Sequence, residues 1–166
     1  MRLSGPRSGL GLAVAALVFA LDRANKLWLI EGLDIAGSGP LEVTPFLDLV
    51  MVWNPGISYG LLQRGDDLWR YALIGFALAV SAVLVLWLAR VRGRAVAIGI
   101  GLVLGGALSN PVDRLVYGAV ADFYRLHAFG HSWYVFNLAD AAIVAGAAIL
   151  LYESFDLGHK SARKRQ

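Results

Sequence analysis

The sequence predicts an all-α membrane protein, with four transmembrane helices and a small extracytoplasmic β-sheet on the membrane surface. Hydrophobic residues make up 58% of its 166 residues and charged residues 16%, whereas soluble domains average about 45–50% and about 25%. Several apolar stretches approach the roughly 20 residues that a helix needs to cross the hydrocarbon core. We therefore expect residues 1–166 to form a single integral membrane domain.

The predicted spans cover about residues 10–30, 68–89, 95–117 and 136–152. The first resembles a cleaved signal peptide, because basic residues precede an apolar run. It has no small-residue cleavage site, however, and it contains three charged side chains, so we interpret it as a retained helix. Those charged residues are Asp22, Arg23 and Lys26.

The distribution of Lys and Arg predicts the orientation. Basic residues flank the ends of the chain and the segment around Arg90–Arg94, whereas residues 31–67 hold six acids and one base. The positive-inside rule then places both termini and the 90–94 loop in the cytoplasm. Segments 31–67 and 118–135 face the outside, and residues 153–166 form a basic cytoplasmic tail that we expect to be disordered.

The first outer segment favours short strands. Residues 41–53 are rich in Val, Leu, Phe and Trp, and Gly37, Gly39 and Pro40 before them predict a turn. This pattern indicates the small sheet. We expect the second outer segment, residues 118–135, to form a loop without strands.

Several familiar chemistries are excluded or weakly supported. The chain has no cysteine, so disulfides and thiolate chemistry are impossible. No metal site is expected, because there is no HExxH motif and His127 and His131 lack further ligands. No cofactor or nucleic-acid partner is expected either. Ser58 and Ser109 have no evident histidine base, and a serine–lysine dyad would need a Lys26 that Asp22 more naturally occupies.

The informative residues are polar groups at or near membrane depth. An ionisable group there costs at least about 2.5–3.5 kcal/mol on insertion scales, so it is a functional candidate by default. Each also has a structural explanation. Asp22 and Lys26 can pair at i,i+4, and Asn54-Pro55-Gly56 is a turn sequence. The remaining candidates are Asn110, Asp113, Arg114, Asp122, Asn137 and Asp140.

Three helix features follow from local sequence. Asn110-Pro111 with Asp113 predicts a helix start or a kink, and Asn137 is expected to cap the fourth span with Asp140 at position N3. Gly101 and Gly105 form a small-xxx-small pair that predicts close helix packing. Capping and helix-dipole interactions alone would explain these acids.

The functional alternative pairs Asp122 with Asp140 across the outer loop. Two adjacent carboxylates do not both ionise easily, so one retains a proton. The ionised carboxylate can then activate water while the protonated one donates to a scissile carbonyl. The spacing of the two aspartates in the sequence gives only weak support for this pairing. A proton-coupled transporter or a non-catalytic membrane adaptor stays open, although acids at the outer edge and the lack of an internal repeat disfavour transport.

Taken together, five segments in order resemble the lipoprotein signal peptidase family, also called signal peptidase II. They are Asp22…Lys26, Asn54-Pro55-Gly56, the stretch from Gly105 to Arg114, Val120-Ala121-Asp122-Phe123 and Phe136-Asn137-Leu138-Ala139-Asp140. The resemblance implies an aspartyl endopeptidase of the bacterial cytoplasmic (inner) membrane. It would remove signal peptides from prolipoproteins, cutting before the diacylglyceryl-modified cysteine.

The resemblance also implies roles for residues and partners. Asp122 and Asp140 would be the catalytic pair, with Asp113 as a rival that we keep as support. Substrate would be bound by Asn54, Gly56, Asn110, Arg114 and Asn137, and Asp22 and Lys26 would brace the site. The expected partners are the prolipoprotein and membrane lipid, and the expected state is a monomer with its site at the outer face.

The chain departs from the family pattern at a few positions near the proposed site. They are Asn25, Ser58, Tyr59, Ser109 and Pro111. None removes a proposed catalytic group, so the departures concern the shape of the pocket and not the class of reaction.

Overall fold

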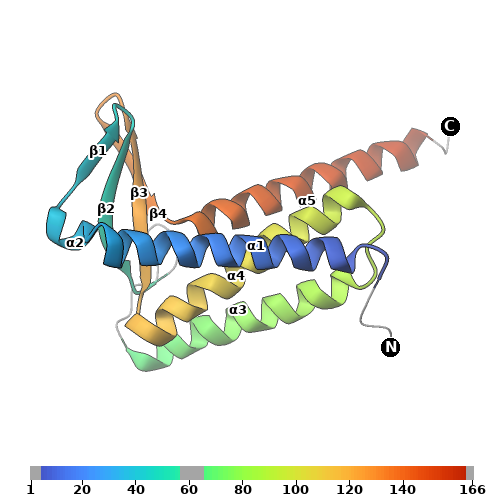
Figure 1. Ribbon diagram of the computed structural model, residues 1–166. Helices are drawn as coiled ribbons and strands as arrows, with labels where there is room; N and C mark the ends of the chain where they lie inside the picture. The colour runs from blue at the N-terminus through green and yellow to red at the C-terminus, as the bar shows by residue number, and fades with distance from the viewer. Residues whose placement is uncertain (1–4, 57–65, 164–166) are drawn as a thin grey trace.

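The computed structural model describes residues 5–56 and 66–163, with side chains described up to residue 155. Long helices lie side by side, and a sheet runs across one end of them (Figure 1). Three described helices are long and apolar enough to cross a membrane: α3 (Asp67–Leu88), α4 (Arg94–Tyr117) and α5, of which residues Leu138–Phe155 qualify. The protein is therefore a mostly helical membrane protein.

Helix α1 (Ser8–Leu27) is of similar length but carries charged residues near its end, where it passes into a π-helical turn, η1 (Trp28–Gly32). Its Asp22 and Lys26 are buried although the outward-facing leucines of the same helix are exposed. The charged residues thus face the bundle, and the apolar ones face outward, as expected of a helix surrounded by lipid.

Helix α4 packs against α1, α3 and α5, and glycines set its distance from two of them. A Cβ added at Gly105 would lie 2.6 Å from the backbone oxygen of Ala15 on α1. A Cβ at Gly106 would lie 2.4 Å from the backbone oxygen of Ala139 on α5. Gly101 meets α1 in the same way, which confirms the predicted small-xxx-small contact.

The sheet has four antiparallel strands in the order β1-β2-β3-β4. The first hairpin, β1 (Leu41–Thr44) and β2 (Leu47–Asn54), confirms the predicted strands. It follows a short helix, α2 (Ile35–Ser38), and a turn at Gly39, whose φ is +74°. Strands β3 (Val120–Ala128) and β4 (His131–Phe136) form the second hairpin. Segment 118–135 is therefore a sheet hairpin, and the loop predicted there was wrong.

Two helix predictions also need correction. Helix α4 runs through Pro111 without a new start. Proline removes one backbone hydrogen bond, but tight packing on both sides holds the helix in place, and neighbours can compensate such a break in a membrane helix. Helix α5 continues to Arg163, so the helix extends well into the predicted tail.

Candidate active site

A cluster of polar side chains lies where the sheet meets the helix ends. Asp122 comes from β3, Asn54 from the end of β2, and Asp140 from the first turn of α5. Helix α4 supplies Asn110 and Arg114. The antiparallel register places Asn54 opposite Val120 and Val52 opposite Asp122, which brings the ends of β2 and β3 together at the helices.

The carboxylate of Asp122 accepts hydrogen bonds from two asparagine amides. Asn137 Nδ2 lies 2.6 Å from Asp122 Oδ1, and Asn54 Nδ2 lies 3.1 Å from Asp122 Oδ2. The side chain is 1% exposed. Asn54 is held in turn, because its Oδ1 accepts from the backbone N–H of Gly56 at 3.0 Å. The 54–56 turn therefore sets the position of a donor to Asp122.

Asp140 is fixed by the start of α5. The backbone N–H of Asp140 donates to Asn137 Oδ1 at 3.0 Å, and the Asn137 N–H faces Asp140 Oδ2 at 3.4 Å. This reciprocal pattern is a capping box, and it confirms the predicted cap at Asn137 with Asp140 at N3. Asn110 Nδ2 donates to Asp140 Oδ1 at 2.9 Å. Asn137 thus contacts both aspartates of the predicted pair.

The proton affinity of Asp122 is shifted in the direction that acid–base chemistry requires. Burial raises its pKa, and the negative charge of Asp140 raises it further, to about 7. The amides of Asn54 and Asn137 and the charge of Lys26 act in the opposite direction and limit the shift. A carboxyl group beside a second carboxylate with a pKa near neutrality is suited to hold one shared proton.

A buried charge network lies behind the two aspartates. Lys26 Nζ lies 2.9 Å from Asp22 and 2.6 Å from Asp113, and all three side chains are inaccessible to solvent. Arg23 forms a second ion pair with Asp113, whose other oxygen also accepts from the Ala121 N–H at 3.3 Å. Both oxygens of Asp113 are thus occupied by cations, which disfavours it as a member of the proton-sharing pair.

Lys26 also sets the orientation of Asn110. Its Nζ lies 3.0 Å from Asn110 Oδ1, and an ammonium group has donors but no acceptor. Asn110 must therefore turn its oxygen toward Lys26 and its NH₂ group toward Asp140. The same oxygen accepts from Asn137 Nδ2 at 3.3 Å. The described groups of Asn110 are engaged with the protein, which favours a positioning role over the substrate-binding one.

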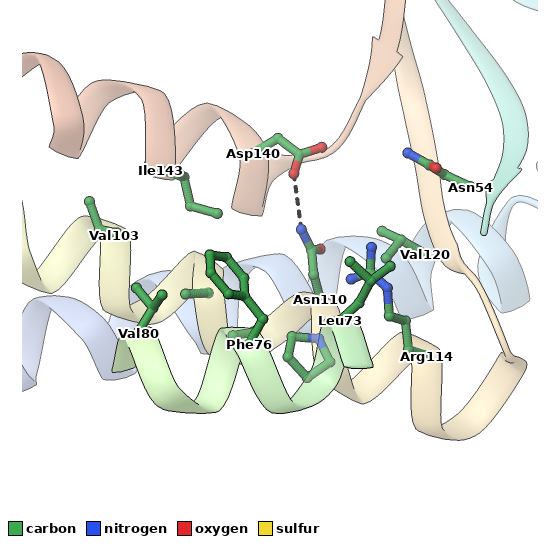
Figure 2. A pocket seen from close by; sticks show the side chains of 13 residues that line it. Asn54, Leu73, Phe76, Val80, Val103, Asn110, Arg114, Val120, Asp140 and Ile143 are labelled. Carbon is green, nitrogen blue, oxygen red and sulfur yellow. Dashed lines mark hydrogen bonds between the residues drawn. The ribbon is translucent and has the colours of Figure 1, made fainter. Parts of the chain in front are cut away.

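A pocket of about 250 Å³ opens beside this cluster, between α3, α4 and α5. Figure 2 shows Asn54, Arg114, Asn110 and Asp140 at its polar end and Val80, Val103 and Ile143 at its apolar end. Arg114 donates to the backbone oxygen of Gly56 at 2.6 Å. Its buried Nε has no partner among the residues that the structure describes.

The structure brings together all the predicted site residues that it describes. It also adds residues that sequence reasoning did not place there. Arg23 pairs with Asp113, Ser109 Oγ donates to Asp22 at 2.6 Å, and the Tyr124 hydroxyl donates to Asn25 at 3.0 Å. Asn25 and Ser109, which take part in two of these contacts, are also positions that depart from the family pattern. Ser58 and Tyr59 lie outside the described residues.

The rival chemistries find little support. His127 Nε2 lies 3.1 Å from Asp48 Oδ1, and His131 Nδ1 lies 3.1 Å from the Phe129 carbonyl, both on the sheet and away from the pocket. No group of three potential metal-ligating side chains occurs within the described ranges. Lys26, the base of a serine–lysine dyad, is instead held between two carboxylates.

Two carboxylates meet at Asn137: Asp122 is buried on β3, and Asp140 lines a pocket between apolar helices. This is the arrangement expected of a membrane-embedded aspartic peptidase. The comparisons agree: the model of the signal peptidase (SPase) II family matches residues 14–156. This chain belongs to the signal peptidase II family, whose members are aspartic-type peptidases.

Relatives and solved structures support the assignment. The lipoprotein signal peptidase of Methylocella silvestris is 55% identical over 145 residues, which cover 87% of this chain and 85% of the relative. That of Nitrobacter hamburgensis is 48% identical over 153 residues, covering 90% and 92%. A bacterial membrane enzyme solved by the in meso method at 2.3 Å resolution shares the fold, with a TM-score of 0.78 over 89% of this chain and 88% of the other at 24% identity.

Proposed function

We propose that this chain removes the signal peptide from bacterial prolipoproteins by cutting before a diacylglyceryl-modified cysteine, with Asp122 and Asp140 as the catalytic pair. The observation that carries the residue assignment is Asn137. Its side chain bonds to Asp122 at 2.6 Å and to the backbone of Asp140 at 3.0 Å. Its backbone N–H also faces the Asp140 carboxylate at 3.4 Å, so one residue contacts both carboxylates.

The pair hydrolyses a peptide with one shared proton. The ionised carboxylate takes a proton from a water molecule, whose oxygen attacks the scissile carbonyl carbon, while the protonated carboxyl donates to the carbonyl oxygen. The tetrahedral intermediate then breaks at the C–N bond as a proton passes to the departing nitrogen. No metal, cofactor or covalent intermediate is needed. The raised pKa of Asp122, about 7, supports a singly protonated pair near neutral pH.

The pocket suits a substrate that is partly peptide and partly lipid. Its polar end offers Arg114, whose guanidinium already binds the Gly56 carbonyl and could bind a substrate carbonyl from Nε. Its apolar end extends between α3, α4 and α5 along Val80, Val103 and Ile143 (Figure 2). An apolar signal-peptide segment or an acyl chain would enter this end laterally from the bilayer. Asn54 and Asn137 would then act through Asp122, and Asn110 through Asp140.

We infer a fourth span, α1, and an orientation with both termini in the cytoplasm. The start of α1, the 89–93 connection and the far end of α5 lie at the end of the bundle opposite the sheet (Figure 1). Basic residues gather at that same end, including Arg90, Arg92 and Arg94, as expected of a cytoplasmic face. The sheet and the aspartates would then lie at the outer face of the bacterial inner membrane, and the protein would act as a monomer.

The test is cleavage of a diacylglyceryl-modified prolipoprotein peptide by the purified full-length protein in detergent. Asp122→Asn and Asp140→Asn should each lower the rate by at least about 10²–10⁴-fold, the usual contribution of a positioned acid or base. Asp66→Asn is the matched control. Asp66 caps α3 by accepting from the Trp69 N–H at 2.7 Å, and asparagine caps helices equally well.

Asp113→Asn separates this pair from its rival. We expect it to destabilise the protein through the Lys26 network while retaining cleavage in the folded fraction. A folded Asp113→Asn variant without activity, beside an active Asp122→Asn variant, would move the catalytic pair. A folded wild type that cuts no lipid-modified peptide would contradict the proposed substrate.

A further inference from the structure

We propose that the two hairpin turns of the sheet form an aromatic wedge that inserts into the lipid bilayer beside α5. The wedge consists of residues 44–47 and 126–133. The inference rests on the membrane placement proposed above, but it assigns lipid contact to residues that take no part in the candidate active site.

The two turns lie next to each other at the same end of the sheet. Leu47 on β2 pairs with Leu126 on β3, and the backbone N–H of His127 donates to the Phe46 carbonyl at 3.0 Å. The turn between β1 and β2 is therefore bonded to the end of the β3–β4 hairpin. As a result, Phe46 and Phe129, one from each turn, belong to a single surface.

This surface is strongly apolar and exposed. Phe129 is 98% exposed, Phe46 59% and Trp133 56%, and Leu126 is also exposed. Phe129 has a φ of +52°, a left-handed conformation in which bulky side chains are uncommon and glycine or asparagine is favoured. A fully exposed phenylalanine in that conformation is unfavourable in water on both grounds, whereas burial in lipid would offset the cost.

The charge pattern points to lipid as the occupant. Residues 44–47 and 126–133 contain no Asp, Glu, Lys or Arg, and their only titratable side chains are His127 and His131. The nearest charges are neutralised within the sheet, where Asp48 contacts Arg125 at 2.7 Å and His127 at 3.1 Å. Uncharged apolar side chains such as Phe46 and Phe129 suit the lipid, and Trp133 is of a residue type enriched at the membrane–water interface.

The position of the wedge relative to α5 also favours contact with the bilayer. The strands run across the helix ends, and the turns project sideways past the start of α5 (Figure 1). Strand β4 ends at Phe136 and α5 begins at Leu138, so the sheet lies level with the boundary of that span. Helix α5 also carries exposed apolar side chains, Val144 and Leu151. The turns therefore project beyond the described helices, where lipid would surround the bundle (Figure 1).

The absence of cysteine from the sequence allows a clean test. The full-length Phe129→Cys variant is labelled with the environment-sensitive fluorophore NBD and reconstituted in nanodiscs of phosphatidylethanolamine and phosphatidylglycerol. We expect blue-shifted emission and strong quenching by lipids that carry a doxyl group near the start of the acyl chain. Glu42→Cys, at an exposed site on β1, is the matched control and should show neither effect.

The outcomes are distinct. Equal, water-like emission from both labelled sites overturns the wedge, as does blue-shifted emission at position 129 that doxyl lipids do not quench, which would indicate protein contact such as a second copy. Peptide cleavage is measured in the same nanodiscs. An active enzyme without quenching refutes the wedge alone, whereas unlabelled wild type that cuts no prolipoprotein peptide refutes the proposed function and leaves the quenching result standing.

Discussion

The side-chain amide of Asn137 lies 2.6 Å from a carboxylate oxygen of Asp122, although one residue caps a helix and the other lies on a strand. Asn137 is fully buried, and its carbonyl oxygen accepts from the Asp140 N–H at 3.0 Å. Because the cap fixes the side chain, the amide points toward Asp122 at 2.6 Å and toward the Asn110 oxygen at 3.3 Å. The start of α5 thereby couples the two aspartates.

Replacing Asn137 by serine tests this coupling. Serine retains the N-cap acceptor, so we expect the stability of the helix to change little. The amide donor to Asp122 is lost, and since that donor lowers the pKa of Asp122, the pKa should rise. The alkaline limb of the cleavage rate should move to higher pH, and the maximal rate should fall roughly 10–100-fold, within the range for a misplaced catalytic group. An unchanged pH profile would limit Asn137 to capping.

The pH dependence of stability provides a second test, through Asp122. Its folded-state pKa of about 7 exceeds the ordinary 3.8, so the folded protein binds the proton more tightly. The contribution of this group to stability is full below the ordinary pKa and is lost as the pH rises through about 7. Relative to Asp122→Asn, which mimics the neutral acid, wild type should lose stability by at most about 1.4 kcal/mol per pH unit in that window. Thermal unfolding between pH 4 and 8 measures the difference, and parallel curves would contradict it.

Local features of the site were predictable from the sequence. The Asn137 cap and the Asp22–Lys26 pair each depend on residues three or four positions apart, where helical geometry alone decides which groups meet. The spacing of Gly101 and Gly105 also predicted a close helix contact, although it did not identify α1 as the partner. The strands at residues 41–53 followed from their composition. The family resemblance then named Asp122 and Asp140, which spacing had supported only weakly.

The long-range partners were not predictable. Lys26 was assigned to Asp22, but it also binds Asp113, 87 positions away, and no local rule selects that partner. The β3–β4 hairpin was missed because Val120 to Phe123 are all buried, so the alternation that marks a half-exposed strand is absent. A stretch rich in Tyr, Trp, Val and Phe around Gly130 was the signal that would have indicated it.

The charge network gives a third prediction, from a pair of matched substitutions. Lys26→Met removes the cation shared by Asp22 and Asp113, which should destabilise the protein by about 3–5 kcal/mol, as is typical of a buried ion pair that loses one partner. Arg23→Met should cost much less, because the Arg23 side chain is partly exposed and Lys26 still contacts Asp113. Thermal unfolding in detergent compares the two, and similar losses would contradict the central place of Lys26.

Helix packing gives a fourth prediction. A Cβ at Gly106 would lie 2.4 Å from the Ala139 oxygen, so Gly106→Ala must push α5 away at the residue before Asp140. We expect a loss of about 1–3 kcal/mol from overpacking, together with reduced cleavage. Gly75→Ala is the control on α3, where no atom lies within 4 Å of the added Cβ. It should leave cleavage intact and stabilise the helix by roughly 0.5–1 kcal/mol.

The pocket gives the last prediction, because neighbouring alanines of α3 differ in what they face. Ala77 lines the pocket, whereas Ala79 is exposed on the outside of the same helix. Ala77→Trp should fill the apolar end and raise KM for the lipid-modified peptide by roughly 10-fold or more, since about 1.4 kcal/mol of lost binding corresponds to tenfold. Ala79→Trp adds the same bulk toward lipid and should leave KM near the wild-type value. If both variants bind substrate as wild type does, the substrate does not occupy the space between α3, α4 and α5, and the lateral entry of its apolar part must follow another face of the bundle.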